Sequence, residues 1–271
     1  MSTVTPSPVD PHLPGVPDRL VLALRELAAT GRLLVALDFD GTLAPEVDDP
    51  ARARALPEAR EAVLRLLGLP STRVALVSGR ALESLEEVSQ LPDEALLVGS
   101  HGVEIRLDPD EDAVRLNPVE LAKVDRLEGV LKGIARGIDN VWIEDKPAGF
   151  ALHTRLATDK HSRVAHVVAL SEARAEVAGV HVREGKNVLE FSVRSTTKGE
   201  AVEHLRRYTG ATAVLYAGDD VTDEDAFAVM RAGDVGVKSG PGTTSAAYRV
   251  RGPEQVAHVL SLLADFRGAS A

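Results

Sequence analysis

Short runs of apolar residues that end abruptly at polar ones recur along this sequence. Leu33–Leu37 is apolar throughout and stops at Asp38, and similar runs occupy Val74–Val77 and Ala213–Ala217. Such runs are typical of strands that are buried on both faces, as in a parallel sheet. Helical periodicity occupies the stretches Asp18–Ala29, Pro57–Leu67, Leu82–Gln90, Lys198–Tyr208, Asp223–Arg231 and Pro253–Phe266. Strands and helices in this arrangement predict a doubly wound α/β parallel sheet, with polar residues gathered at the carboxyl ends of its strands.

The pattern changes between about residues 106 and 194. Strands predicted at 150–155 and 188–193 alternate apolar and polar side chains, which is typical of an antiparallel sheet with one covered face. The other elements predicted there are helices at 118–136 and 160–175 and strands at 141–145 and 180–183. We therefore predict an α+β cap domain, residues 106–194, inserted into a core formed by 18–105 and 195–271. Residues 1–17 carry five prolines and little apolar content, which predicts a flexible tail.

Composition limits the classes of partner. Acidic residues outnumber Lys and Arg by 41 to 31, and the net charge of −10 argues against nucleic acid or an anionic membrane as a partner. Aromatic residues make up only 3% of the chain, too few for a platform that stacks single-stranded bases. The chain has no cysteine, which excludes disulfides and thiolate zinc sites, and no apolar run approaches the ~20 residues of a membrane span. We expect a soluble, cytoplasmic, monomeric protein that acts on a small molecule.

Two carboxylates follow the first apolar run. In an extended chain Asp38 and Asp40 point to the same side while Phe39 points back into the core, so the two carboxylates converge above the sheet edge. This pair can divide phosphate hydrolysis: Asp38 attacks phosphorus and forms an aspartyl phosphate, and Asp40 protonates the departing alcohol and later accepts a proton from water. An acidic turn after a strand is the simpler alternative. The buried strand before the pair and Gly41-Thr42 after it favour the catalytic interpretation.

A second acidic group follows the third apolar run. A carboxylate that attacks a phosphate anion faces like-charge repulsion, and Mg²⁺ held by carboxylates relieves that repulsion. We predict that Asp38, the backbone carbonyl of Asp40 and Asp219 bind Mg²⁺. Asp220 and Asp223 either bind the metal directly or orient its waters. The alternative is that these acids only begin a helix, which leaves the adjacent Asp219 and Asp220 unexplained.

Ser78 and Lys198 are predicted to complete the phosphate site. Ser78 stands where a strand turns into a helix, and Gly79 lets the backbone approach an anion, so the hydroxyl and nearby N–H groups can hold phosphate oxygens. Thr197 and Glu200 have the spacing of a capping box, which places Lys198 in the first turn of a helix. A cation is poorly placed there for the helix dipole, which indicates a local anionic partner. Considered singly, a simple turn at Ser78 and a solvated Lys198 remain the alternatives.

These motifs stand in the order found in the haloacid dehalogenase superfamily, which the chain resembles. The matching motifs are Asp38-x-Asp40-Gly-Thr, Ser78, Lys198 and Gly218-Asp219-Asp220-x-x-Asp223. Within that superfamily, the stretches similar to trehalose-6-phosphate phosphatases are Val77-Ser-Gly-Arg80, Gly99-Ser-His-Gly-Val-Glu104, Glu144-Asp-Lys146 leading to His153-Thr-Arg155, Gly185-Lys-Asn-Val-Leu-Glu190, and Tyr216–Phe227. The resemblance runs from about Leu33 to Met230. It implies a core with a cap that screens substrates, a Mg²⁺ cofactor and trehalose 6-phosphate as the substrate.

The same resemblance implies which residues bind the sugar phosphate. The candidates in the cap are Lys146, His153, Arg155, Lys186 and Glu190, and the candidates in the core are Arg80 and His101. Taken one at a time, most of these side chains have a structural alternative, such as a solvated strand residue or a residue that fills a turn. Two other functions also remain open. One is a related sugar phosphatase for sucrose phosphate, mannosyl-phosphoglycerate or hexose phosphate, and the other is a non-catalytic sugar-phosphate sensor, against which the intact pair of Asp38 and Asp40 counts.

Overall fold

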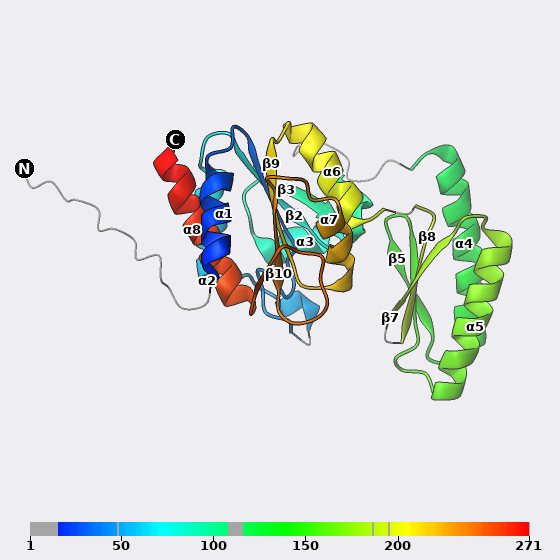
Figure 1. Cartoon of the computed structure of the whole chain (residues 1–271). Helices are drawn as coiled ribbons and strands as arrows, with labels where there is room; N and C mark the ends of the chain where they lie inside the picture. Colours follow the sequence, from blue (N-terminus) through cyan, green and yellow to red (C-terminus); the bar gives the residue numbers. More distant parts are fainter. Residues whose placement is uncertain (1–15, 48, 108–115, 186, 195, 271) are drawn as a thin grey trace, which may run out of the picture.

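A sheet of seven strands forms the core of the protein. The structure is a computed structural model that describes residues 16–47, 49–107, 116–185, 187–194 and 196–270. The strands lie in the order β11-β10-β9-β1-β2-β3-β4, and every neighbouring pair is parallel except β3 with β4 (Figure 1). Their bounds are Leu33–Leu37 (β1), Thr72–Val77 (β2), Leu96–Gly99 (β3), Glu104–Arg106 (β4), Ala213–Gly218 (β9), Val235–Ser239 (β10) and Tyr248–Val250 (β11). The predicted α/β core is confirmed.

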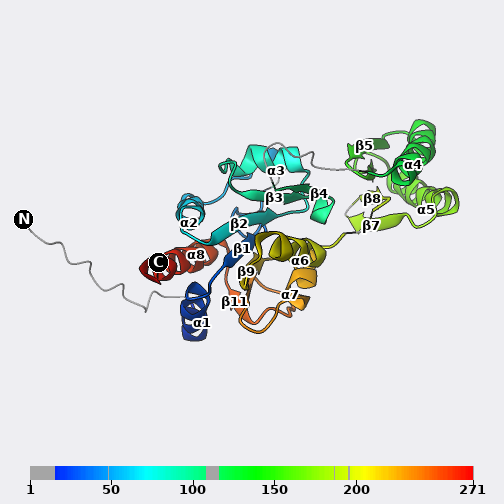
Figure 2. The ribbon, with the colours of Figure 1, turned by 90° about the horizontal axis from the view of Figure 1, so that it is seen from above.

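Helices cover both faces of this sheet. Their bounds are Asp18–Ala28 (α1), Pro57–Leu67 (α2), Leu82–Ser89 (α3), Lys198–Thr209 (α6), Glu224–Ala228 (α7) and Pro253–Ser270 (α8). The odd-numbered residues of β1 pack into one cluster with α1, α2, α3 and α8, and its even-numbered residues pack into another with α6 and α7. Figure 2 shows α1 and α8 on one side of the sheet and α6 and α7 on the other. The continuous apolar run of β1 therefore reflects burial on both faces.

A second sheet lies between β4 and α6 in the chain, and together with its two helices we call it the inserted unit (residues 118–192). Its elements are α4 (Pro118–Gly137), β5 (Trp142–Lys146), β6 (Gly149–His153), α5 (Asp159–Glu176), β7 (His181–Gly185) and β8 (Val188–Ser192). The strands are antiparallel in the order β5-β6-β8-β7. Helices α4 and α5 pack on one face, around Leu152, Leu189 and Phe191, and Figure 1 shows them on the side away from the core. The polar face of the sheet is therefore turned toward the core.

Several details differ from the sequence-based expectations. The helix predicted at 223–231 is shorter in the structure, where α7 covers only Glu224–Ala228. Asp223 instead closes the 3₁₀ turn Val221–Asp223, and its carboxylate accepts hydrogen bonds from the N–H groups of Asp219 and Asp220. The predicted boundary at residue 106 falls inside β4, which belongs to the large sheet. The alternation predicted for residues 150–155 would place Ala151 on the open face of β6, but Ala151 is fully buried. The apolar runs also did not predict β3, β4, β10 or β11.

The N-terminal part of the chain is described only from residue 16 onward. Val16, at the end of the predicted tail, packs against the core cluster, while residues 1–15 lie outside the described residues. In the second half of the chain, the capping box predicted from Thr197 and Glu200 is present and starts α6. Among the described helices, none is long and apolar enough to cross a membrane.

Candidate active site

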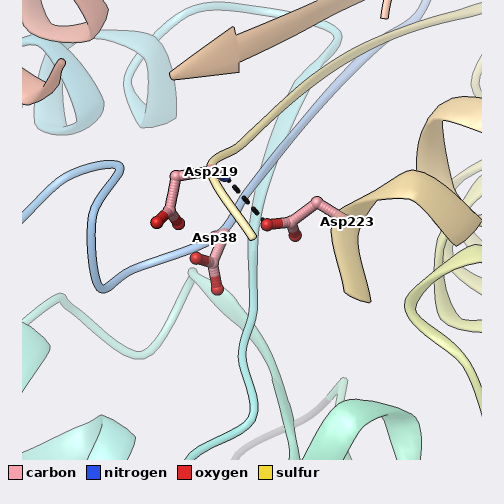
Figure 3. Close-up of side chains that lie close together, drawn as sticks. All are labelled: Asp38, Asp219 and Asp223. Atoms are coloured by element: carbon pink, nitrogen blue, oxygen red, sulfur yellow. Dashed lines mark hydrogen bonds between the residues drawn. The ribbon is translucent and has the colours of Figure 1, made fainter. Parts of the chain in front are cut away.

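Three carboxylates meet where β1, β9 and the turn before α7 end. Asp38 follows β1, Asp219 follows β9 and Asp223 lies in the turn, and one oxygen of each lies within 4.8 Å of the other two (Figure 3). The Nζ atom of Lys198, at the start of α6, donates a hydrogen bond to Asp38 Oδ1 (2.8 Å) and another to Asp223 Oδ1 (2.7 Å). This lysine therefore has two anionic partners, which accounts for a cation at the amino end of a helix.

Burial governs the electrostatics of this group. Asp38 and Lys198 are 5% and 3% exposed, and Asp223 is fully buried. Burial raises the pKa of the Asp38 carboxyl well above its ordinary value, although the Lys198 charge opposes this, and burial also raises the pKa of Asp219. Burial alone would lower the pKa of Lys198, yet the facing carboxylates of Asp38 and Asp223 raise it above its ordinary value. Lys198 is therefore a permanent positive charge beside Asp38.

The carboxylate of Asp223 accepts hydrogen bonds from neighbouring protein groups. Its Oδ1 accepts hydrogen bonds from Lys198 and from the hydroxyl of Tyr216 (2.6 Å), and its Oδ2 accepts from the N–H groups of Asp219 (2.9 Å) and Asp220 (2.8 Å). These bonds use the four acceptor positions of a carboxylate. Asp223 thus fixes both the lysine and the turn that carries Asp219. Asp220 is exposed at the cavity rim and stands outside the group of three converging carboxylates.

The donor set suits a hard divalent cation. Three carboxylates converge here, and two of them, Asp38 and Asp223, contact the ammonium of Lys198. Carboxylate oxygens are the ligands that Mg²⁺ prefers. The loop after β1 closes tightly on Asp219, because a Cβ atom at Gly41 (φ 72°) would lie 2.1 Å from Asp219 Oδ2. Thr42, fully buried, donates to Asp219 Oδ1 at 3.3 Å. The residues present are therefore compatible with a bound metal.

Ser78 lies at the carboxyl end of β2, next to the β1 edge. It is almost fully buried, and its Oγ accepts a hydrogen bond from the N–H of Arg80 (3.2 Å). Among the described residues the Ser78 hydroxyl donates to no acceptor, so its proton can reach a bound ligand. Gly79 makes room for the imidazole of His101, because a Cβ atom there would lie 2.6 Å from His101 Cε1. His101 adopts φ 56°. Burial, with the Arg183 and Lys198 charges, lowers its pKa to about 3, so the ring is neutral at physiological pH.

The carboxylate of Asp40 forms an ion pair with Arg80. The Nε and Nη2 atoms of Arg80 donate to the two carboxylate oxygens of Asp40, both at 2.6 Å. This is the two-pronged geometry that a planar guanidinium forms with a carboxylate. The structure therefore places Arg80, predicted as a substrate contact, directly on the predicted acid–base residue.

These side chains line one cavity of about 1120 Å³. Its core wall includes Asp38, Asp40, Ser78, Lys198 and Asp219, and the inserted unit contributes Glu144 and Lys146 from β5. A smaller cavity adjoins it between the loop that carries His101 and the polar face of the inserted unit, where it is lined by Lys146, Arg183 and Glu190. The predicted catalytic side chains thus belong to the core, and the inserted unit supplies a second, polar wall.

Comparison with known proteins assigns the chain to a protein family. Residues 36–254 match the family model described as trehalose-phosphatase. The chain belongs to the trehalose-phosphatase family. It is 35% identical over 251 residues to a trehalose-phosphate phosphatase of Mycobacterium avium, with 85% of this chain and 62% of that protein covered, and 30% identical over 279 residues to a probable trehalose-phosphate phosphatase of rice, with 90% and 71% covered. The chain therefore spans less than two thirds of the length of the M. avium relative.

A solved structure agrees with this assignment. The trehalose-6-phosphate phosphatase of Aspergillus fumigatus superposes with a TM-score of 0.70 at 26% identity, with 93% of this chain and 98% of that chain covered. The resemblance to trehalose-6-phosphate phosphatases, read from the sequence motifs, is thereby confirmed.

In this member of the trehalose-phosphatase family, the predicted sugar-binding residues fall in different places. Lys146, Glu190 and His101 line the cavities between the inserted unit and the core. His153 lines neither cavity: its Nε2 is 2.8 Å from Glu144 Oε2, and its ring stacks on Trp142 with centroids 5.0 Å apart. The guanidinium of Arg155 also lies over the ring of Trp142, at 5.4 Å. The remaining candidate, residue Lys186, lies outside the described residues.

Three side chains at this trehalose-phosphatase site were not among the candidates predicted from the sequence. Glu144 holds Lys146 (2.7 Å) and His153 and reaches the large cavity, and its spacing of two from Lys146 in a strand was the available signal. Tyr216 begins one of the stretches that resemble trehalose-6-phosphate phosphatases, but its position inside a continuous apolar run marked it as a core residue. Arg183 stands opposite Glu190 in the register of β7 and β8. Its Nη2 donates a hydrogen bond to the carbonyl of Thr196, in the segment that leads back to the core (3.0 Å). No local pattern marks Arg183.

Proposed function

We propose that this chain hydrolyses trehalose 6-phosphate to trehalose and inorganic phosphate. Membership of the trehalose-phosphatase family supports the reaction and the substrate. The observation that carries the proposal is Lys198, whose ammonium bridges Asp38 and Asp223 in a cavity shared by the core and the polar face of the inserted unit. Such a cation, fixed before the substrate arrives, stabilises both a nucleophilic carboxylate and a transferring phosphoryl group.

In the first step, a carboxylate oxygen of Asp38 attacks phosphorus while the bond from phosphorus to the sugar oxygen breaks. Asp40 gives its proton to the departing sugar oxygen, so the products are free trehalose and an aspartyl phosphate on Asp38. In the second step, water attacks the same phosphorus and gives up a proton to Asp40, and the bond to Asp38 Oδ breaks. The phosphate leaves, and both aspartates return to their starting states.

The chain's own groups hold the phosphoryl group through both steps. The buried ammonium of Lys198 lies 2.8 Å from the attacking carboxylate and remains positive throughout. The hydroxyl of Ser78 has a proton to donate to a phosphate oxygen. Asp38, Asp219 and the backbone carbonyl of Asp40 are the groups that would hold Mg²⁺, with Asp223 fixing the turn, and the cation would supply charge neutralisation for the phosphate oxygens.

The inserted unit acts in this proposal as a cap that selects the sugar. Its polar face offers both charge signs to sugar hydroxyls, which are donors and acceptors: Glu144 and Glu190 accept hydrogen bonds, while Lys146 and Arg183 donate them. His153 holds Glu144 through a hydrogen bond, and its ring stacks on Trp142, over which the guanidinium of Arg155 also lies. When the cap closes, the same face excludes water from the phosphate site.

The test is a panel of phosphorylated sugars assayed for phosphate release by the purified chain. We expect the highest kcat/KM with trehalose 6-phosphate, above sucrose phosphate, mannosyl-phosphoglycerate and glucose 6-phosphate. A preference for one of the other sugars would keep the reaction and reject the substrate. A chain that binds these compounds but releases no phosphate, with or without Mg²⁺, would reject the enzyme and favour a sensor.

A further inference from the structure

The pairing of Arg80 with Asp40 is tighter than a surface ion pair. Two N–H groups of the guanidinium reach the two oxygens of one carboxylate at 2.6 Å, and the Arg80 side chain is only 10% exposed, against 37% for Asp40. Within the described part of the chain, no other side chain donates a hydrogen bond to the Asp40 carboxylate. The orientation of that carboxylate therefore depends on one residue.

Arg80 is itself held from several sides. Its Nη1 donates to the carbonyl of Pro50 (2.9 Å) and to the hydroxyl of Ser84 (3.3 Å), and its guanidinium carbon lies 5.7 Å from the ring centroid of Phe39. Together with the two bonds to Asp40, these contacts occupy four of the five N–H groups of the guanidinium. Arg80 thus has little capacity left for a sugar or a phosphate while it holds Asp40.

We propose that Arg80 is a positioning residue that acts through Asp40. This inference rests on the proposed function, in which Asp40 protonates the leaving sugar oxygen. A carboxylate that must meet one oxygen has to be held in one orientation, and small misplacements of a catalytic group cost large factors in rate. Because Arg80 is anchored to Pro50 and Ser84, it links Asp40 to the start of the 3₁₀ helix Pro50–Arg52 and to α3.

The substrate that reveals this role is one whose leaving group needs no proton. A sugar alkoxide is a poor leaving group and depends on Asp40, whereas an activated aryl phosphate such as p-nitrophenyl phosphate releases a stable phenolate. We expect Arg80→Gln to lower kcat for trehalose 6-phosphate by ~10²-fold while changing KM little. The first step on p-nitrophenyl phosphate, followed as the single-turnover release of nitrophenolate, should keep the wild-type rate, because only the later hydrolysis of the aspartyl phosphate uses Asp40 with this substrate. Equal losses in the single-turnover first step on both substrates would show that Arg80 supports the fold or the phosphate site and would overturn the inference.

A double-mutant cycle separates positioning from direct sugar binding. If Arg80 acts through Asp40, adding Arg80→Gln to Asp40→Asn should cost nothing further on trehalose 6-phosphate. If Arg80 binds the sugar, the two losses should multiply and KM should rise, which would reject the inference. Arg80→Lys keeps the charge but cannot form two parallel bonds, so it should remain impaired. Full activity in Arg80→Lys would show that the charge alone matters and would also reject it.

Two controls make the result interpretable. Arg54 is exposed near the same loop, and among the described residues it donates only to the backbone carbonyls of Ala51 and Ala53, so Arg54→Gln should keep wild-type rates on both substrates. Thermal unfolding of each variant shows whether it is folded. A wild-type protein that releases no phosphate from trehalose 6-phosphate would reject the proposed function itself. If the wild type hydrolyses trehalose 6-phosphate, Asp40→Asn slows the first step on the sugar substrate but not the single-turnover release of nitrophenolate, and Arg80→Gln slows neither, the proposed function stands and this inference alone is rejected.

Discussion

His101 makes the stability of the protein depend on pH in a way that can be worked out from its surroundings. Its imidazole is wedged against Gly79, and within the described residues its Nδ1 is buried without a hydrogen-bond partner. Burial, followed by the positive charges of Arg183 and Lys198, outweighs the opposing charge of Asp223 and lowers its pKa to about 3. The folded protein therefore keeps this ring neutral where an unfolded chain would protonate it.

The sign and size of the effect follow from proton linkage. Because the folded pKa lies below the unfolded value of about 6.5, the contribution of His101 to stability is fully present above pH 6.5 and is lost as the pH falls toward 3. At pH 5 the unfolded chain has gained this proton and the folded chain has not, which lowers the free energy of unfolding by about 2 kcal/mol relative to pH 8. Carboxylates add their own pH dependence, so a difference between variants isolates the histidine.

The assay is urea unfolding of wild type and His101→Asn at pH 8 and pH 5, in the presence of chelator. Asparagine is chosen because it tolerates the positive φ at this position and does not titrate. We expect the wild type to lose about 2 kcal/mol more stability than the variant between the two pH values. Substitution of an exposed histidine, His181→Asn, controls for the loss of a histidine in general. If wild type and His101→Asn lose the same stability, the argument that burial and nearby cations keep this ring neutral is refuted.

Three further predictions address the chemistry and the specificity. Asp38→Asn keeps the size of the side chain but removes the nucleophile, so turnover of trehalose 6-phosphate should fall by ~10⁴-fold or more while the thermal transition remains, and near-normal turnover would reject the covalent step. Excess chelator should abolish phosphate release and Mg²⁺ should restore it, with Asp219→Ala needing more Mg²⁺, whereas full activity in chelator would remove the metal from the mechanism. Glu190→Ala removes a carboxylate from the smaller cavity and should lower kcat/KM for trehalose 6-phosphate by ~10–100-fold, the equivalent of one charge-assisted hydrogen bond. Hydrolysis of p-nitrophenyl phosphate should change far less. Equal losses on both substrates would contradict selection of the sugar by the cap.

The sequence alone determined the architecture near the reacting groups. The run Leu33–Leu37 has no polar side chain on either face, and only a strand covered on both sides accommodates that pattern. Parallel strands end at one edge, so the acids that directly follow β1 and β9 had to come together there. The alternation of Leu189 and Phe191 with polar neighbours likewise marked the covered and open faces of β8.

In contrast, only the tertiary structure decided which side chains form hydrogen bonds with one another. Nothing local to Asp223 indicates that it binds Lys198 and Tyr216, while Asp220 three residues earlier stays exposed. Arg80 was grouped with the substrate contacts, yet the fold gives it Asp40, forty residues away in the chain. Local propensity and periodicity act over a few residues, whereas these hydrogen bonds join side chains from different strands and helices. Their geometry exists only once the sheet has brought the strand ends side by side and packing has fixed each rotamer.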